Sequence, residues 1–252
     1  MTIWENQTAI VTGGASGLGE ATARKLADNG LQVAIFDMNA ARGRTVAEEI
    51  GGTFHTVDVT DVDSVATAIG NISGPIRVIV NCAGIAPAAK TVSRGEAHDP
   101  ALFAKTIQVN LIGSFICASQ AAAAMTALDP LDDDGTRGVI VNTASVAAFD
   151  GQVGQAAYAA SKGGIAGLTL PMARDLADKG VRVCAIAPGL FLTPMLEGLP
   201  EEVQTSLGTQ VPFPSRLGSP SEYAKLVCHI LDNPMLNGEV IRLDGAIRMA
   251  PR

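Results

Sequence analysis

Residues Thr8–Gly19 read TAIVTGGASGLG, a short apolar run that leads directly into a glycine-rich turn. The run Thr8–Thr12 predicts a buried strand, and the residues after the turn predict a helix. Gly13, Gly17 and Gly19 permit a tight turn and a close approach of the backbone to a ligand. The N–H groups at the start of such a helix favour a pyrophosphate, although the glycines alone could also form a simple turn.

Strands and helices alternate along the rest of the chain. Further strands are expected near residues 33–36, 54–57, 78–80, 139–141, 181–187 and 239–243, with helices between them. The 252 residues show no internal repeat and no break in composition. This pattern predicts an α/β fold of one domain (residues 1–252), with a Rossmann-type, doubly wound parallel sheet of about seven strands and helices on both faces.

Asp37 ends the second expected strand, ~20 residues beyond the glycines, where a carboxylate holds the ribose hydroxyls of a dinucleotide. A carboxylate there repels the additional phosphate of NADP. No basic residue adjoins the glycines or directly follows Asp37, because Arg42 and Arg44 come later, on the next helix. The sequence therefore favours NAD, with a helix-capping role for Asp37 as the alternative.

Polar and small residues follow the next two strands. Asp58 and Val59 stand where they would contact the adenine, although Asp58 could equally cap the helix that starts near Asp61. The corner Asn81–Gly84, NCAG, consists of small residues that let the backbone pass close to a cofactor. Asn110 interrupts an apolar stretch of the long helix expected over residues 100–127, and a buried Asn needs hydrogen-bond partners.

The stretch Gly138–Gly167 begins as an apolar strand and ends as a helix of small residues. Tyr158 and Lys162 are four residues apart, so they share one helix face. An ammonium one turn away is expected to stabilise the Tyr158 phenolate and lower its pKa. Such a tyrosine exchanges a proton with a carbonyl or hydroxyl oxygen, and Ser145 can hydrogen-bond the same oxygen. This predicts oxidation and reduction at a carbonyl, whereas an isolated Tyr–Lys pair would be an ordinary feature of a surface helix.

The composition excludes several classes of function. A net charge of −7 without a Lys/Arg run argues against nucleic-acid and anionic-membrane binding. The four cysteines are scattered, without a CxxC pair, so we expect neither a metal site nor disulfides. No apolar run appears long enough to span a membrane. The first residues resemble neither a signal nor a transit peptide, which predicts a cytoplasmic protein.

Three irregular segments are expected. Residues 85–98 predict a polar insertion without regular structure, and residues 129–138 an acidic, solvated turn. Residues 189–218 form a connection long enough for a substrate lid. The lid segment's apolar side chains suggest a hydrophobic substrate, unless they simply pack on the body; they are Phe191, Leu192, Met195, Leu196, Leu199, Val203, Leu207, Val211 and Phe213.

Taken together, these motifs resemble those of the short-chain dehydrogenase/reductase family over the whole chain. The resemblance rests on TGGASGLG, NCAG, Asn110, Ser145, YAASK (Tyr158–Lys162) and a PG turn with Thr193. The runs IAPGLF, QVPFPSRLG and NGEVIRLDGAIRM are further similar to the branch of type II 3-hydroxyacyl-CoA dehydrogenases, also known as hydroxysteroid dehydrogenases. Animal members of that branch are mitochondrial, and without an import signal this chain is expected to be a bacterial counterpart.

The resemblance implies a role for each matching residue. Tyr158 would be the acid/base, Lys162 would lower its pKa and bind the nicotinamide ribose, and Asn110 would hold a water in a proton relay. Ser145, Gln155 and Tyr158 would bind the substrate. The implied NAD contacts are Gly13, Ser16, Leu18, Gly19, Asp37, Asp58, Val59, Cys82, Gly84, Tyr158, Lys162, Phe191 and Thr193.

The implied activity is hydride transfer between NAD and the 3-position of a 3-hydroxyacyl-CoA, in a homotetramer. A departure at Leu192, where a smaller residue is expected, leaves acyl-chain preference open. Dehydrogenation of steroids or other secondary alcohols, reduction of 3-oxoacyl-carrier-protein, and a dinucleotide-dependent scaffold or sensor are the alternatives.

Overall fold

The computed structural model describes residues 3–198 and 200–251. Leu199 and the side chain of Met195, both predicted to belong to the lid, lie outside the described part. Seven parallel strands form one sheet in the order β3-β2-β1-β4-β7-β8-β9, which confirms the predicted doubly wound fold. The strands are β1 (Thr8–Thr12), β2 (Gln32–Asp37), β3 (Thr53–Thr56), β4 (Ile76–Asn81), β7 (Gly138–Thr143), β8 (Val181–Pro188) and β9 (Val240–Leu243).

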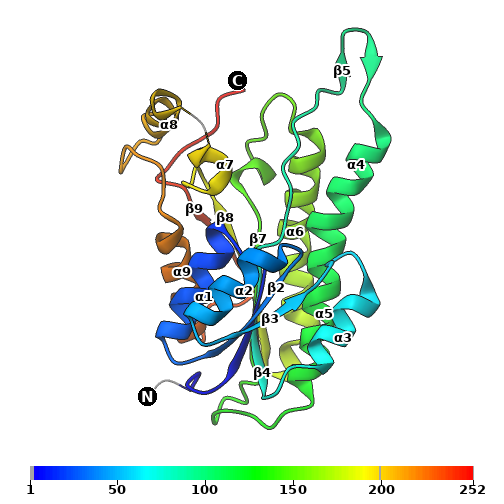
Figure 1. Cartoon of the computed structure of the whole chain (residues 1–252), viewed down its shortest axis with the longest axis vertical. Helices are drawn as coiled ribbons and strands as arrows, with labels where there is room; N and C mark the ends of the chain where they lie inside the picture. The colour runs from blue at the N-terminus through cyan, green and yellow to red at the C-terminus, as the bar shows by residue number, and fades with distance from the viewer. Residues whose placement is uncertain (1–2, 199, 252) are drawn as a thin grey trace.

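Helices cover both faces of this sheet (Figure 1). Helices α1, α2 and α9 pack on one face, and α3, α5 and α6 on the other. The helices are α1 (Gly17–Asp28), α2 (Ala40–Glu49), α3 (Val62–Gly70), α4 (Pro100–Ile107), α5 (Ser114–Thr126), α6 (Ala156–Asp175), α7 (Pro194–Glu197), α8 (Glu201–Gly208) and α9 (Pro220–Asp232).

Side chains alternate between two cores along each central strand. On β1, Ala9 and Val11 pack with α1 and α9, whereas Ile10 packs with α5 on the opposite face. Both faces of a parallel sheet are covered, so β1, β4 and β7 are fully buried, and the middle of each strand is apolar.

The long helix expected over residues 100–127 is interrupted in its middle. A π-helical segment, η1 (Gln108–Gly113), joins α4 to α5 and contains Asn110. By length and composition the whole helix Pro100–Thr126 is able to cross a membrane, so the prediction that no apolar segment reaches that length is wrong. Its α5 part instead buries Cys117, Ala121 and Met125 against the sheet, which explains the apolar composition.

Two segments expected to be irregular are partly ordered. The insertion 85–98 contains an antiparallel hairpin of β5 (Val92–Ser93) and β6 (Glu96–Ala97), which extends away from the body near α4 (Figure 1). In the acidic turn, Asp132 accepts a hydrogen bond from Thr136 N (2.9 Å), and Arg137 Nε donates to Leu128 O (2.9 Å). The segment is thus a hydrogen-bonded turn rather than a merely solvated one.

Candidate active site

The glycine-rich turn after β1 is held together by backbone contacts that exclude side chains. Gly13 has φ +65°, and a Cβ added there would lie 2.8 Å from Ala83 N in the NCAG corner. A Cβ on Gly19 would overlap the carbonyl oxygen of Gly13. The backbone of the glycine-rich turn therefore lies against the backbone of the NCAG corner. The two segments follow β1 and β4, which are neighbours in the sheet.

The start of α1 has the properties of an anion site. Ser16 is the N-cap residue, yet its exposed side chain makes no capping hydrogen bond, so its hydroxyl and the first N–H groups of α1 are available to a pyrophosphate. Thr193 lies beside this turn, because a Cβ on Gly17 would be 3.7 Å from the Thr193 side chain. Thr193 likewise makes no side-chain cap at α7. These groups fit a dinucleotide, with Leu18 packed below them against the core.

Asp37 is not a helix cap. Its Oδ2 accepts from Ala15 N (3.0 Å) in the glycine turn, and its Oδ1 accepts from Asn39 N (2.8 Å). Asn39 caps α2 instead, by accepting from Arg42 N. The carboxylate of Asp37 is thereby fixed at the carboxyl end of β2, next to the turn.

Asp58 and Val59 stand at the equivalent end of β3. Asp58 accepts from Thr60 N (2.9 Å) and Thr60 Oγ1 (2.8 Å), while Asp61 caps α3. The alternative role of Asp58 as the cap is therefore wrong. Val59 is buried against Gly113 of the π-helical segment, where an added Cβ would lie 2.7 Å from the valine.

Ser145, Tyr158 and Lys162 converge at the end of β7. Ser145 is buried and accepts from Ala147 N (3.1 Å), as the N-cap of the 3-10 turn Val146–Ala148. On α6, the Lys162 Nζ lies 5.9 Å from the centre of the half-buried Tyr158 ring. The side chain of Ser145 acts on Tyr158 as a hydrogen-bonding neighbour that lowers the pKa of the phenol. The structure thus brings all three residues together.

The electrostatics of this group differ from the sequence-based expectation. Burial raises the pKa of Tyr158, and the hydrogen bond with Ser145 offsets this only in part. The ammonium of Lys162 points to the carbonyl oxygen of Thr143, with Nζ at 2.6 Å. Burial lowers the pKa of Lys162 to about 8. In this arrangement Lys162 does not lower the pKa of Tyr158 as predicted, because burial dominates and its ammonium is bound elsewhere.

Asn110 is fully buried, and its amide has structural partners. Oδ1 accepts from Ile85 N (2.8 Å), while Nδ2 donates to Ile85 O (2.8 Å) and Ser161 Oγ (3.0 Å). A Cβ on Gly84 would lie 3.2 Å from Asn110 Oδ1 and 3.8 Å from Lys162 Nζ. Asn110 therefore ties the corner after β4 to α6 close to Lys162, from within the π-helical segment of its helix.

A buried polar group behind Lys162 was not anticipated. Thr143 Oγ1 donates to Asn81 O (2.6 Å) and lies 2.7 Å from the hydroxyl of Tyr223, which is completely buried on α9. The Cys82 thiol lies 3.8 Å from the same hydroxyl. Tyr223 looked like an ordinary helix residue, and only the rarity of tyrosine, with 2 in the chain, marked it.

The segment that links Ser145 to α6 borders a cleft of about 410 Å³. Gln155, at the start of α6, accepts from Gln152 N (3.0 Å) through its Oε1. The cleft is lined by Lys90, Thr91, Val92, Gly151, Gln152, Val153, Gly154, Gln155, Ala156 and Ala159. It lies between the β5–β6 insertion and the loop that joins Ser145 to α6.

Residues 189–218 have a mixed character. Phe191 is buried against Gly218, and Val211 is also buried, so these two pack on the body. Val203 and Phe213 are exposed. The apolar content of this segment is thus divided between the core and the surface.

The comparisons with known proteins agree with this geometry. The family model described as short chain dehydrogenase matches residues 7–204. The 3-hydroxyacyl-CoA dehydrogenase type-2 of Drosophila melanogaster is 52% identical over 254 residues, covering 98% of this chain and 99% of that protein. The protein of the same name from Homo sapiens is 54% identical, covering 96% and 95%.

Solved structures share the fold at lower sequence identity. The crystal structure of 3-hydroxyacyl-CoA dehydrogenase type-2 from Mycobacterium avium superposes with a TM-score of 0.96 at 44% identity, covering 100% of both chains. An actinorhodin polyketide ketoreductase variant with NADPH has a TM-score of 0.85 at 29% identity, covering 95% of this chain and 96% of that chain. The chain therefore belongs to the short-chain dehydrogenase family, and it is an oxidoreductase that uses a nicotinamide dinucleotide with a small-molecule substrate.

Proposed function

We propose that this protein is an NAD-dependent 3-hydroxyacyl-CoA dehydrogenase of the cytoplasm. The observation that carries the proposal is the convergence of Ser145, Tyr158 and Lys162 at the same edge of the sheet as the glycine turn and Asp37. The names of the most similar relatives supply the substrate class. The free thiols of all four cysteines fit a reducing compartment.

The residues of the site have complementary roles in this mechanism. NAD supplies the hydride acceptor when bound, and NADH the hydride donor. Ser145 binds and orients the reacting oxygen of the substrate. Tyr158 removes the hydroxyl proton in oxidation and returns it to the developing oxyanion in reduction. Lys162 would bind the cofactor ribose when NAD is present, and its positive charge would then favour the Tyr158 phenolate.

The preference for NAD rests on charge. Asp37 ends β2 beside the glycine turn, and a carboxylate at that position of this fold would repel the additional phosphate of NADP. Arg42, the next basic residue, is already paired with Glu20, with Nη2 and Oε1 2.6 Å apart. Partial burial raises the pKa of Glu20, but hydrogen bonds from Arg42 and Arg24 outweigh it and hold that pKa below its usual value, so the ion pair persists at neutral pH.

The substrate side suits a long, anionic thioester. Lys90 lines the cleft together with Gln155, and its exposed ammonium is available to attract a phosphate of coenzyme A. We propose that residues 189–218 close over the acyl part as a lid, with Val203 and Phe213 as exposed apolar contacts.

The test is NADH and NADPH oxidation by the purified protein with acetoacetyl-CoA and with ethyl acetoacetate. We expect turnover with NADH alone, and a lower KM for the thioester. Lys90→Glu should raise the KM for acetoacetyl-CoA by roughly tenfold and leave that for ethyl acetoacetate unchanged. Turnover of the small ester alone would discard the acyl-CoA assignment, and a preference for NADPH would discard the role of Asp37.

We further propose a homotetramer built on α5 and α6. The outer surface of these helices is apolar and small: Phe115 and Leu170 are exposed, and a Cβ on Gly163 or Gly167 would meet no atom within 4 Å. A second copy can therefore approach closely. Light scattering should give four chains for the wild type and fewer for Gly167→Glu, whereas Gly70→Glu, at another exposed glycine, should not change the mass.

A further inference from the structure

We propose that Arg242 is a positioning residue of the active site, which holds the loop from Ser145 to Gln155 in register through Asp150. This inference rests on the proposed roles of Ser145 and Gln155. Arg242 lies at the carboxyl end of β9, paired in register with Ala187 of β8. It is therefore at the same edge of the sheet as the reacting groups.

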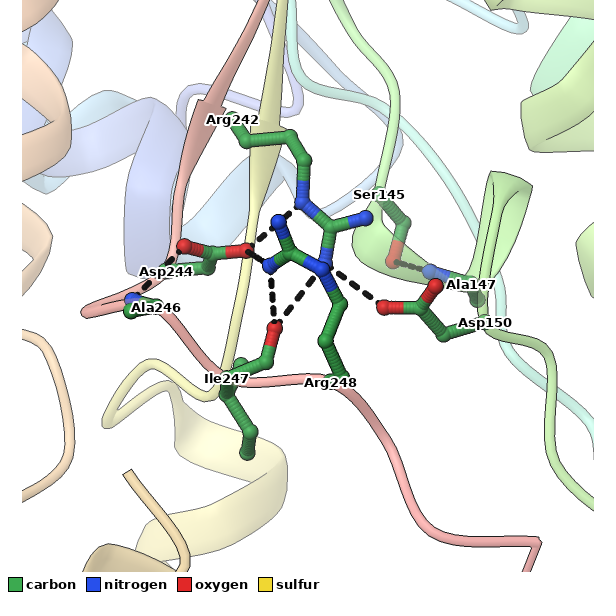
Figure 2. Close-up of polar contacts among 8 residues, drawn as sticks. All are labelled: Ser145, Ala147, Asp150, Arg242, Asp244, Ala246, Ile247 and Arg248. Atoms are coloured by element: carbon green, nitrogen blue, oxygen red, sulfur yellow. Dashed lines mark hydrogen bonds and ion pairs between the residues drawn. The ribbon is translucent and has the colours of Figure 1, made fainter. Parts of the chain in front are cut away.

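A single guanidinium joins three segments here (Figure 2). Arg242 Nη2 donates to Asp150 Oδ2 (2.6 Å) on the Ser145 loop, and Nε donates to Asp244 Oδ2 (2.7 Å) on its own strand end. Nη2 also donates to Ile247 O (3.0 Å) in the C-terminal segment. The guanidinium lies 5.3 Å from the centre of the Phe149 ring.

The contact with Asp150 reaches Ser145 through one turn of backbone. Asp150 N donates to Val146 O (2.8 Å), and Ala147 N donates to Ser145 Oγ (3.1 Å). The residues between Asp150 and Ser145 form a tight 3-10 turn. A displacement of the Asp150 carboxylate would therefore move the turn that orients the Ser145 hydroxyl.

The C-terminal segment secures the other end of the same loop. Gln152 Nε2 donates to Ala250 O (2.9 Å), and Val153 N donates to Pro251 O (3.0 Å). Gln152 N in turn donates to Gln155 Oε1 (3.0 Å). Arg242 of β9 thus fixes the end of the loop that carries Ser145, and residues after β9 fix its other end.

Arginine is required here because its acceptors diverge. The planar fork of five N–H donors serves two carboxylates and one carbonyl at once, which a lysine ammonium on a flexible stem does not reproduce. Side chains of Arg242 and Asp150 are mostly shielded, with 21% and 19% exposed. The hydrogen bond from Arg242 holds the pKa of Asp150 below its ordinary value, so the pair is charged at the pH of any assay near neutrality.

The experiment compares Arg242→Lys with Arg182→Lys. Arg182 is also largely buried and donates to Ile230 O (2.9 Å), Leu231 O (2.9 Å) and Leu236 O (2.7 Å), but it lies at the amino end of β8, opposite the site. Four quantities are measured for each variant: hydrogen–deuterium exchange of residues 144–156, kcat with a ketone that the wild type reduces, the KM for NADH, and the melting temperature. Asp150→Asn serves as a second variant that weakens the contact from the loop side.

We expect Arg242→Lys and Asp150→Asn to speed exchange of residues 144–156 and to lower kcat roughly 10- to 100-fold with an unchanged KM for NADH. Arg182→Lys should lower the melting temperature without either effect. The proposal is overturned if loop exchange in the Arg242 and Asp150 variants equals that of Arg182→Lys. A wild type that fails to reduce acetoacetyl-CoA contradicts the proposed function instead, and the exchange comparison still decides the role of Arg242.

Discussion

The cofactor side and the substrate side of this site are built in different ways. On the cofactor side, the glycine turn, the start of α1 and Asp37 come from one βαβ unit, and most contacts are made by backbone atoms. On the substrate side, the loop after Ser145 is held by side chains up to 92 residues away in sequence. The shape of the cofactor side therefore depends on glycines, which have no side chain. The shape of the substrate side depends on particular side chains such as that of Arg242.

The largest effect on activity is expected at Tyr158, where the cofactor side and the substrate side of the site meet. Tyr158→Phe removes the hydroxyl that exchanges the substrate proton and should lower kcat/KM by about 10²- to 10⁴-fold. NADH binding, followed by fluorescence titration, should remain within a few-fold of the wild type, because the ring and its packing are kept. A variant with wild-type turnover would show that another group handles the proton.

On the cofactor side, a substitution that adds a side chain to the glycine turn is expected to weaken NADH binding. A Cβ in Gly19→Ala would overlap the Gly13 carbonyl, so the turn must open and lose its shape for the pyrophosphate. We expect NADH affinity to fall by roughly tenfold or more, which corresponds to at least about 1.4 kcal/mol. Gly70→Ala on α3, where an added Cβ meets no atom within 4 Å, is the matched control and should bind NADH normally. Equal affinities for both variants would contradict the steric account.

This contrast also explains what the sequence could predict. The sheet, Asp37 and the Ser145–Tyr158–Lys162 group followed from local patterns, because strand ends meet at one edge of a parallel sheet. The Arg242–Asp150 contact is invisible to such patterns, since nothing in either neighbourhood indicates its partner.

Two local features, the β5–β6 hairpin and the π-helical segment, could not be predicted from the sequence, for physical reasons. The β5–β6 hairpin turns at Arg94 and Gly95, with φ +52° and +84°. An arginine rarely adopts such a conformation, so the turn carried no recognisable signal. The π-helical segment around Asn110 likewise arises from tertiary contacts with Ile85 and Ser161 rather than from propensity.

Lys162 also lies where the two sides of the site meet, and its burial can be tested through the pH dependence of the free energy of unfolding. Its pKa falls from 10.5 in the unfolded chain to about 8 in the folded protein, so between these values the unfolded state binds more protons and stability rises with pH. Below pH 8 the wild type bears the full cost of burying the ammonium, roughly 3 kcal/mol for this shift. The stability of Lys162→Met relative to the wild type should therefore decrease from pH 7 to pH 10.

Denaturant unfolding of both proteins at several pH values measures this difference. Because other groups titrate alike in the two proteins, only the difference between them reports on Lys162. A difference that stays constant across this range would mean that Lys162 is not buried as an ammonium. Activity should be lost in Lys162→Met at every pH, since the phenolate of Tyr158 loses its positive neighbour.

The smallest effect on activity is expected at Tyr223, which lies behind Lys162 in the buried polar group around Thr143. Tyr223→Phe removes the hydroxyl 2.7 Å from Thr143 Oγ1 but keeps the ring, and Thr143 Oγ1 still donates to Asn81 O. The free energy of unfolding should fall by about 1 kcal/mol, with kcat within a few-fold of the wild type. Thr143→Val, which also removes the bond to Asn81 O, should cost more. A large loss of kcat in Tyr223→Phe at unchanged stability would instead mean that this hydroxyl helps to position Lys162 through Thr143. Particular side chains would then shape the site around Lys162 as well as the loop after Ser145.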